Sequence, residues 1–150
     1  MKPLRLYFDN CCFNRPFDDQ SQLLVRLETE AKLFIQEGIK KGTFELVWSY
    51  ILDVENNSNP SPDKKEQIRS WKSLAISDIE ASDEVICRAK EFVNQGLKTK
   101  DALHVACAIK ASADYFITVD RGILKKKVKG IWTMNPLEFL LVFKELNKNE

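Results

Sequence analysis

The stretch of sequence that decides the fold is TKDALHVACAIKASADYFITVD, residues 99–120. Apolar residues recur at helical spacing over 100–111, and the apolar run at 115–119 then predicts a strand. Asp101 falls in the first turn of the expected helix, and Asp120 follows directly on the expected strand. The segment therefore predicts a helix that leads into a strand, with a carboxylate at each of these two points.

The rest of the chain repeats this alternation of strands and helices. It is typical of an α/β sandwich with a mainly parallel sheet. A chain of 150 residues has the size of one ordinary domain, so we expect a single domain over residues 1–150. Further strands are expected at 4–8, 45–48 and 131–132, and helices at 23–35 (broken by Gly38 and Gly42), 50–55, 63–74 (capped by Asp63), 83–93, 124–127 and from Pro136 onward.

The composition excludes several classes of protein. Hydrophobic residues make up 44% and charged residues 30% of the chain, which is typical of a soluble globular domain and not of a disordered one. No apolar run approaches the ~20 residues needed to cross a bilayer, and the N-terminus MKPLRLYFDN makes a poor signal peptide. We therefore expect a cytoplasmic protein that does not enter a membrane. The net charge of +1 neither favours nor excludes nucleic acid as a partner.

The cysteines and the single histidine do not form a zinc motif. No C-x-x-C pair occurs, so buried free thiols are the expected state of the four cysteines. His104 lies three residues after Asp101, on nearly the same face of the helix, and could act as a ligand or acid–base group. Packing against a neighbour is the commoner role for such a histidine. Trp48 and Trp132 fall in expected strands, where core packing is the commoner role.

Four acidic residues are expected to meet at one edge of the sheet: Asp9, Glu55, Asp101 and Asp120. Ligands of open parallel sheets bind beyond the carboxyl ends of the strands, where Asp9 and Asp120 are placed. Carboxylates this close repel each other unless a cation lies among them, and their hard oxygen atoms suit Mg²⁺ or Mn²⁺. Each acid alone is better explained as a turn, cap or solvated helix residue. The joint placement of all four favours a metal site.

At these residues the sequence resembles the PIN-domain family of metal-dependent ribonucleases, which includes many toxins of bacterial toxin–antitoxin pairs. The resemblance covers nearly the whole chain and rests on four segments. It implies a PIN-like three-layer α/β/α sandwich with a five-stranded parallel sheet, and a Mg²⁺- or Mn²⁺-dependent endoribonuclease. It implies that the same four acids coordinate the metal. The segments are the strand that ends in Asp9, Ser49…Glu55, KDALHVA at 100–106 and FITVD at 116–120.

The resemblance also assigns supporting residues and partners. Asn10 stands where the family often has a small hydroxylic residue, and Thr118 matches a hydroxyl two residues before the last acid. RNA is the implied substrate, a small antitoxin protein a possible partner, and a homodimer a plausible assembly. Basic side chains could bind the phosphate backbone at the rim, or could form an ordinary solvated surface. Those considered are Arg15, Lys98, Lys100, Arg121 and Lys125 to Lys127, with Arg15, Lys100 and Arg121 proposed as substrate-binding.

Other functions fit the sequence less well. A haloacid-dehalogenase-like phosphatase needs a second aspartate two residues after the first, and Cys11 occupies that position. A receiver domain needs an acidic pair after the first strand and a late lysine, where Asn10 and Thr133 stand. The alternative that stays open is a PIN-fold module that binds RNA or protein without catalysis.

Overall fold

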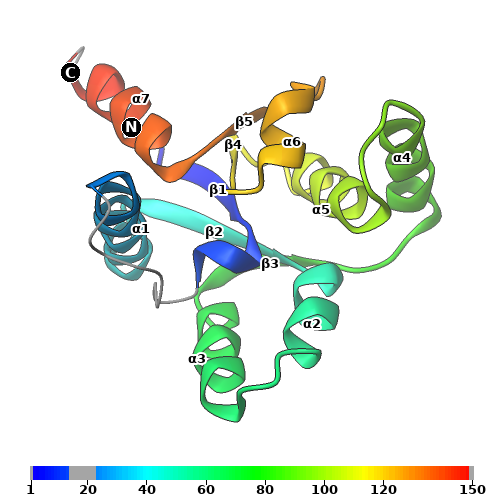
Figure 1. Cartoon of the computed structure of the whole chain (residues 1–150), viewed down its shortest axis with the longest axis horizontal. Coiled ribbons are helices and arrows are strands. Elements are labelled where there is room, and N and C mark those ends of the chain that lie inside the picture. Colours follow the sequence, from blue (N-terminus) through cyan, green and yellow to red (C-terminus); the bar gives the residue numbers. More distant parts are fainter. Residues whose placement is uncertain (1, 14–22, 149–150) are drawn as a thin grey trace.

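The computed structural model describes residues 2–13 and 23–148, which form one sheet with helices packed on its faces (Figure 1). Its strands are β1 (Leu4–Phe8), β2 (Phe44–Ser49), β3 (Ala75–Ile79), β4 (Tyr115–Ile117) and β5 (Trp132–Met134). Its helices are the 3₁₀ turn η1 (Asn10–Cys12), α1 (Leu23–Lys41), α2 (Tyr50–Asn57), α3 (Pro62–Lys72), α4 (Asp83–Asn94), α5 (Thr99–Lys110), α6 (Arg121–Lys126) and α7 (Pro136–Lys148).

All strand pairs of the sheet are parallel, and their order is β3-β2-β1-β4-β5. The central strand β1 pairs with both β2 and β4, so that Tyr7 lies opposite Val47 on one side and Phe116 on the other. The carboxyl ends of β1, β2 and β4 therefore meet at one edge. This arrangement confirms the α/β fold class expected from the sequence.

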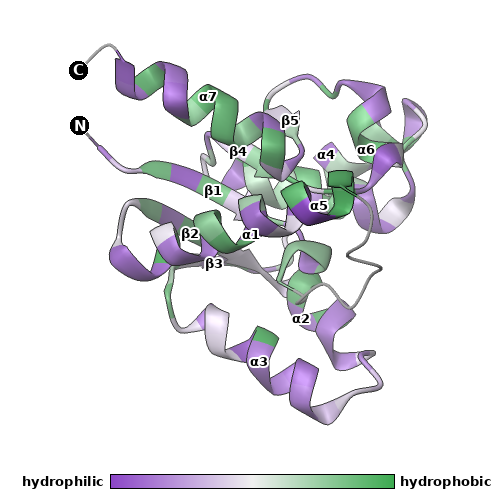
Figure 2. Cartoon of the chain, turned by 60° about the vertical axis from the view of Figure 1, so that its left-hand side comes forward, coloured by the Kyte–Doolittle hydropathy of each residue, from purple (hydrophilic) through white to green (hydrophobic). Residues whose placement is uncertain are grey.

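Alternation of side chains along the strands sends neighbouring residues to opposite layers of helices. Tyr7 contacts His104 of α5 on one face of the sheet. Phe44 contacts Phe139 and Phe143 of α7 on the other face, where α1 packs beside α7. Helix α4 packs on α5, which completes three layers. Figure 2 shows long hydrophobic stretches in α5 and α7, whereas α3 is largely hydrophilic.

Helix α1 continues through Gly38, a position at which the sequence predicted a break. The ring of Phe44 lies so close to Gly38 that a Cβ atom there would come within 2.5 Å of it, so glycine makes room for the ring inside a regular helix. The helix ends at Lys41 instead, just before Gly42, whose φ of +83° belongs to the left-handed region.

We expect Gly38→Ala to lower the free energy of unfolding by about 1–3 kcal/mol, the usual cost of overpacking a core. The added methyl group would displace Phe44, which is only 2% exposed, and this cost exceeds the helix propensity of ~1 kcal/mol that alanine gains over glycine. Urea denaturation measures the change. Glu37→Ala, at an exposed position of the same helix, is the control and should change stability by less than about 0.5 kcal/mol. An unchanged or raised stability of the alanine variant would contradict the packing.

Several local predictions were wrong. Strand β3 was not predicted from the sequence, because it pairs only with β2 and its residues alternate between half-buried and exposed. Strand β4 ends at Ile117, not at residue 119. Helix α3 is capped by Ser61, whose Oγ accepts from the backbone N–H of Lys64 at 3.3 Å, and not by Asp63.

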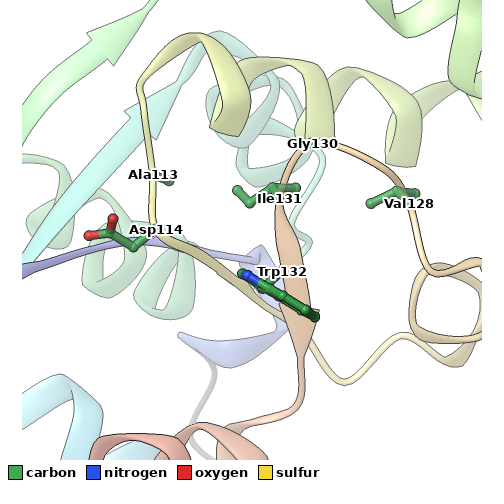
Figure 3. A pocket seen from close by; sticks show the side chains of 6 residues that line it. All are labelled: Ala113, Asp114, Val128, Gly130, Ile131 and Trp132. Carbon is green, nitrogen blue, oxygen red and sulfur yellow. The ribbon is translucent and has the colours of Figure 1, made fainter. Parts of the chain in front are cut away.

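Trp132 does not pack into the core, because β5 is an edge strand. Its side chain is 74% exposed, whereas Trp48 is fully buried as expected. Trp132 lines a cavity of about 470 Å³ together with Asp114 and Val128. Figure 3 shows these side chains. Asp114 precedes β4, so this cavity lies at the opposite end of the sheet from the four acids.

Two further predictions can be compared with the structure. All four cysteines are free thiols; Cys12 and Cys107 are buried as expected, but Cys87 is exposed and Cys11 half-buried. Among the described residues, no helix combines the length and the apolar character that a membrane span requires.

Candidate metal centre

The four acids lie on the elements from which the sequence placed them. Asp9 follows β1 directly, and its backbone N–H donates to the carbonyl of Ile117 in β4 at 3.0 Å. Glu55 lies in α2, the helix that follows β2, and Asp101 lies in the first turn of α5. Asp120 is the N-cap of α6, after β4. Each acid is therefore positioned near the carboxyl edge of the sheet.

Asp9 is the most buried of the four acids, with 7% exposure. Its Oδ2 accepts a hydrogen bond from the Thr118 hydroxyl at 2.7 Å, and its Oδ1 accepts from the backbone N–H of Asn10 at 2.7 Å. Burial raises the pKa of Asp9, and the charge of Glu55 adds to this, although His104 and the two hydrogen bonds act in the opposite direction. The net shift is upward, so the ionised form of Asp9 lacks sufficient positive charge around it.

Thr118, which the resemblance matched to a hydroxyl two residues before the last acid, connects two of the acids. Its Oγ1 donates to Asp9 and accepts from the backbone N–H of Asp120 at 3.0 Å. The carboxylate of Asp120 in turn accepts from the backbone N–H of Gly122 at 2.7 Å, which caps α6. Thr118 thus fixes the position of Asp120 relative to Asp9.

Glu55 forms a hydrogen bond with His104, the only histidine of the chain. The His104 Nε2 atom forms a hydrogen bond to the Glu55 carboxylate and lies 4.0 Å from Oδ1 of Asp9. Burial alone would raise the pKa of Glu55, but the hydrogen bond and charge of His104, together with the nearby Lys100, lower it below the ordinary value. Glu55 is therefore ionised at neutral pH.

Asp101 interacts through charge with all three other acids. Its pKa is raised by burial first, and then by the negative charges of Asp120, Asp9 and Glu55, which outweigh His104. The closest set of potential ligand atoms among the described residues belongs to Asp9, Glu55 and His104, within 4.8 Å of one another. The structure does not bring Asp101 and Asp120 into this close group. The presence of His104 in this group agrees with its position three residues after Asp101 in the sequence.

The remaining candidate residues differ in their relation to the acids. Asn10 contacts Asp9 through its backbone, while its side-chain Oδ1 is buried without a hydrogen-bond partner. Lys100 is exposed and close enough to lower the pKa of Glu55, and Arg121 is exposed at the start of α6. Arg15 lies outside the described residues.

The donor atoms present at this edge fit a divalent cation. The acids offer hard carboxylate oxygens, which Mg²⁺ and Mn²⁺ prefer, and the Nε2 atom of His104 lies next to them as a hydrogen-bond partner of Glu55. The raised pKa values of Asp9 and Asp101 show that these carboxyl groups resist ionisation without additional positive charge. A bound divalent cation would supply that charge.

The raised pKa of Asp101 predicts how the metal-free protein responds to pH. A carboxyl group whose pKa is higher in the folded than in the unfolded state stabilises the fold fully only below its unfolded value, near 3.8, and this contribution is lost as pH rises through the folded value. Relative to Asp101→Asn, we expect the wild type to lose stability between pH 3 and neutrality, about the range in which Asp101 ionises. Urea denaturation of both proteins in chelator, at several pH values across this range, tests the prediction. If the free energy of unfolding of the wild type, relative to that of Asp101→Asn, stays constant or rises with pH, the prediction is wrong.

The chain is similar to known proteins in its structure but not in its sequence. No family model and no curated protein matches this chain. Its structure is similar to that of FitAcB from Neisseria gonorrhoeae, with a TM-score of 0.60 and 14% identity over 87% of this chain and 97% of that one. It is also similar to VapBC2 from Rickettsia felis, bound to a DNA fragment from its promoter, with a TM-score of 0.56 and 13% identity over 88% and 98%. The chain therefore has a PIN-like fold.

Proposed function

We propose that this protein is a Mg²⁺- or Mn²⁺-dependent endoribonuclease that hydrolyses phosphodiester bonds of RNA. The observation that carries the proposal is the set of four acids at the carboxyl edge of a PIN-like parallel sheet, in which Asp101 interacts through charge with the other three. Burial and neighbouring negative charge raise the pKa of two of these acids, Asp9 and Asp101, in the absence of a cation. The resemblance of the sequence to metal-dependent ribonucleases supports RNA as the substrate.

In this proposal the acids have different roles. Asp9, Asp101 and Asp120 would hold the cation, with Glu55 as a further ligand or as a base. The cation, when bound, acts as a Lewis acid that activates water and offsets negative charge on the phosphate. Glu55 is ionised at neutral pH and can accept a proton from an attacking water molecule. Thr118 holds Asp9 in place through its hydroxyl.

Exposed basic residues would bring the RNA to this acidic edge. Lys100 is one residue before Asp101, and Arg121 is one residue after Asp120, so both cations flank the acids in the sequence. A guanidinium group can contact a phosphate through two nitrogens, which makes Arg121 the better candidate for backbone binding. Arg15 remains a candidate from the sequence alone.

A toxin–antitoxin role is the biological form of this proposal. It draws on the sequence resemblance and on the likeness to FitAcB and to VapBC2, the second of which is bound to promoter DNA. The chain would then act as the toxin, form a homodimer and bind a small antitoxin protein. A short upstream gene for a DNA-binding protein would support this role, and its absence across related genomes would weigh against it.

The experiment that tests the nuclease proposal is cleavage of a mixed RNA pool by the purified chain. We expect fragments with Mn²⁺ or Mg²⁺, and none in chelator. If the wild type retains RNA in a binding assay but cuts nothing with either metal, the nuclease proposal fails and a non-catalytic binding module takes its place.

A further inference from the structure

A chain of buried hydrogen bonds runs from the sheet to the acid cluster. The hydroxyl of Ser49, the last residue of β2, lies 2.6 Å from the hydroxyl of Tyr7 in β1. The Tyr7 hydroxyl lies 2.5 Å from Nδ1 of His104, and the Nε2 atom of His104 bonds to Glu55. Ser49, Tyr7 and His104 are at most 1% exposed. These contacts connect β2, β1, α5 and α2.

We propose that His104 is a positioning residue that holds the Glu55 carboxylate at the metal site, and that Tyr7 and Ser49 hold His104 in the required orientation. The inference rests on the proposed function, since it concerns the same acids, but it assigns roles to three residues that the acid set does not include. His104 would act through Glu55 and need not contact the RNA.

The direction of the hydrogen bond between His104 and Glu55 follows from the chemistry of the pair. A carboxylate oxygen accepts hydrogen bonds, so a bond donated by the imidazole to Glu55 requires hydrogen on Nε2 of His104. That leaves Nδ1 facing the Tyr7 hydroxyl, whose oxygen can donate or accept.

The side chain of Tyr7 is held rigidly from several directions. Its ring stacks on Phe116 of the neighbouring strand, with centroids 5.1 Å apart and an interplanar angle of 7°. The His104 ring meets its edge at 72°, with centroids 5.6 Å apart. Tyr7 and Asp9 also lie two residues apart at the end of β1, so one strand positions both the first acid and the support for Glu55.

Glu55 needs such a support because of where it lies. It occupies the last turn of the eight-residue helix α2 and is only half-buried, so its long side chain could adopt several rotamers in the absence of His104. Ser49 would ordinarily cap this helix, but the structure shows no hydrogen bond from its side chain to the α2 backbone. Its hydroxyl contacts Tyr7 instead. A site of this kind is precise only when partners outside the ligand set fix the ligands.

Because His104 is the only histidine, nitrogen-15 NMR of the imidazole group tests the hydrogen-bond chain without assignment, metal or RNA. At one neutral pH we expect Nε2 of the wild type to carry hydrogen. Tyr7→Phe, which keeps the ring, should shift the Nδ1 resonance. Tyr115→Phe, on the adjacent strand, is the control and should leave it in place. A wild-type imidazole with hydrogen on Nδ1 only, or a Tyr7→Phe spectrum identical to the wild type, would overturn the inference.

Direct titration of Mn²⁺, followed by electron paramagnetic resonance, tests the consequence for the site. We expect His104→Leu to weaken Mn²⁺ binding by 10- to 100-fold, roughly the range for residues that orient metal ligands. His104→Gln, whose amide N–H can reach Glu55, should restore most of the affinity. Equal affinities of the leucine variant and the wild type, or no rescue by glutamine, would overturn the inference; the NMR test of Tyr7→Phe decides the matter if His104→Leu fails to fold.

These measurements separate the inference from the proposed function. Neither of them reads RNA cleavage. A protein that shows the expected NMR and Mn²⁺ results but cuts no RNA would contradict the nuclease proposal and leave the role of His104 intact. If the wild type cuts RNA while His104→Leu binds Mn²⁺ as tightly as the wild type, the nuclease proposal is supported and the role of His104 is contradicted.

Discussion

Asp101→Asn is expected to lower Mn²⁺-dependent RNA cleavage by more than about a hundredfold, beyond the usual effect of changing a residue that merely orients a ligand. The substitution preserves the shape of the side chain and removes one negative charge. Asp101 interacts through charge with all three other acids, so its neutral form weakens the hold of the whole cluster on a cation. Initial rates of cleavage of one RNA substrate, at a Mn²⁺ concentration that saturates the wild type, measure the loss.

Asp83→Asn is the matched control for this experiment. Asp83 also lies in the first turn of a helix, α4, and it is exposed, so the same chemical change tests the general effect of losing an acid at a helix start. We expect its cleavage rate to match that of the wild type. Equal rates for Asp101→Asn and the wild type would remove Asp101 from the site, and equal loss in both variants would point to a structural cause.

The second large effect is stabilisation by metal. A ligand that binds only the folded state raises the free energy of unfolding by ~2.7 kcal/mol at a hundred times its Kd. We expect Mn²⁺ to stabilise the wild type in this way and to have almost no effect on Asp9→Asn. Each protein is compared with its own metal-free form, because the asparagine amide cannot accept both of the hydrogen bonds that Thr118 and Asn10 donate to Asp9.

Urea denaturation in the presence of Mn²⁺ and in the presence of chelator, on the wild type, Asp9→Asn and Asp114→Asn, tests this expectation. Asp114→Asn is the control, because Asp114 also borders a strand of the sheet, but at the edge opposite the four acids. Its response to Mn²⁺ should match that of the wild type. If Asp9→Asn were stabilised as strongly as the wild type, Mn²⁺ would bind elsewhere, and the assignment of Asp9 as a ligand would be wrong.

The sequence predicted the elements that carry the acids better than it predicted the edge of the sheet. Apolar runs located β1 and β4, so the positions of Asp9 and Asp120 followed from the rule that parallel strands end at the same edge. Strand β3 was missed because an edge strand that pairs with one neighbour carries a weak apolar pattern. The placement of the acids within one metal site stays a prediction, since the structure shows only that their charges interact.

The role of His104 could not have been derived from the pattern of the sequence. Its spacing to Asp101 indicated the correct face of α5, but its partners Tyr7 and Glu55 are 97 and 49 residues away. Likewise, Ser49 is the N-cap residue of α2, but its hydroxyl forms a hydrogen bond with Tyr7 and not with the helix backbone. Contacts of this kind depend on the register between strands, and local periodicity does not contain that information.

The pairing of β1 with β4 has a consequence for the protein while it is being made. The hydrogen bond from Thr118 to Asp9 joins residues 109 positions apart, and β1 cannot complete its pairing before β4 exists. A growing polypeptide on the ribosome therefore cannot assemble the acid cluster until Asp120 has been synthesised and has emerged. If the assembled cluster cuts RNA, the nascent chain cannot cut its own messenger until at least about four-fifths of the chain has been translated.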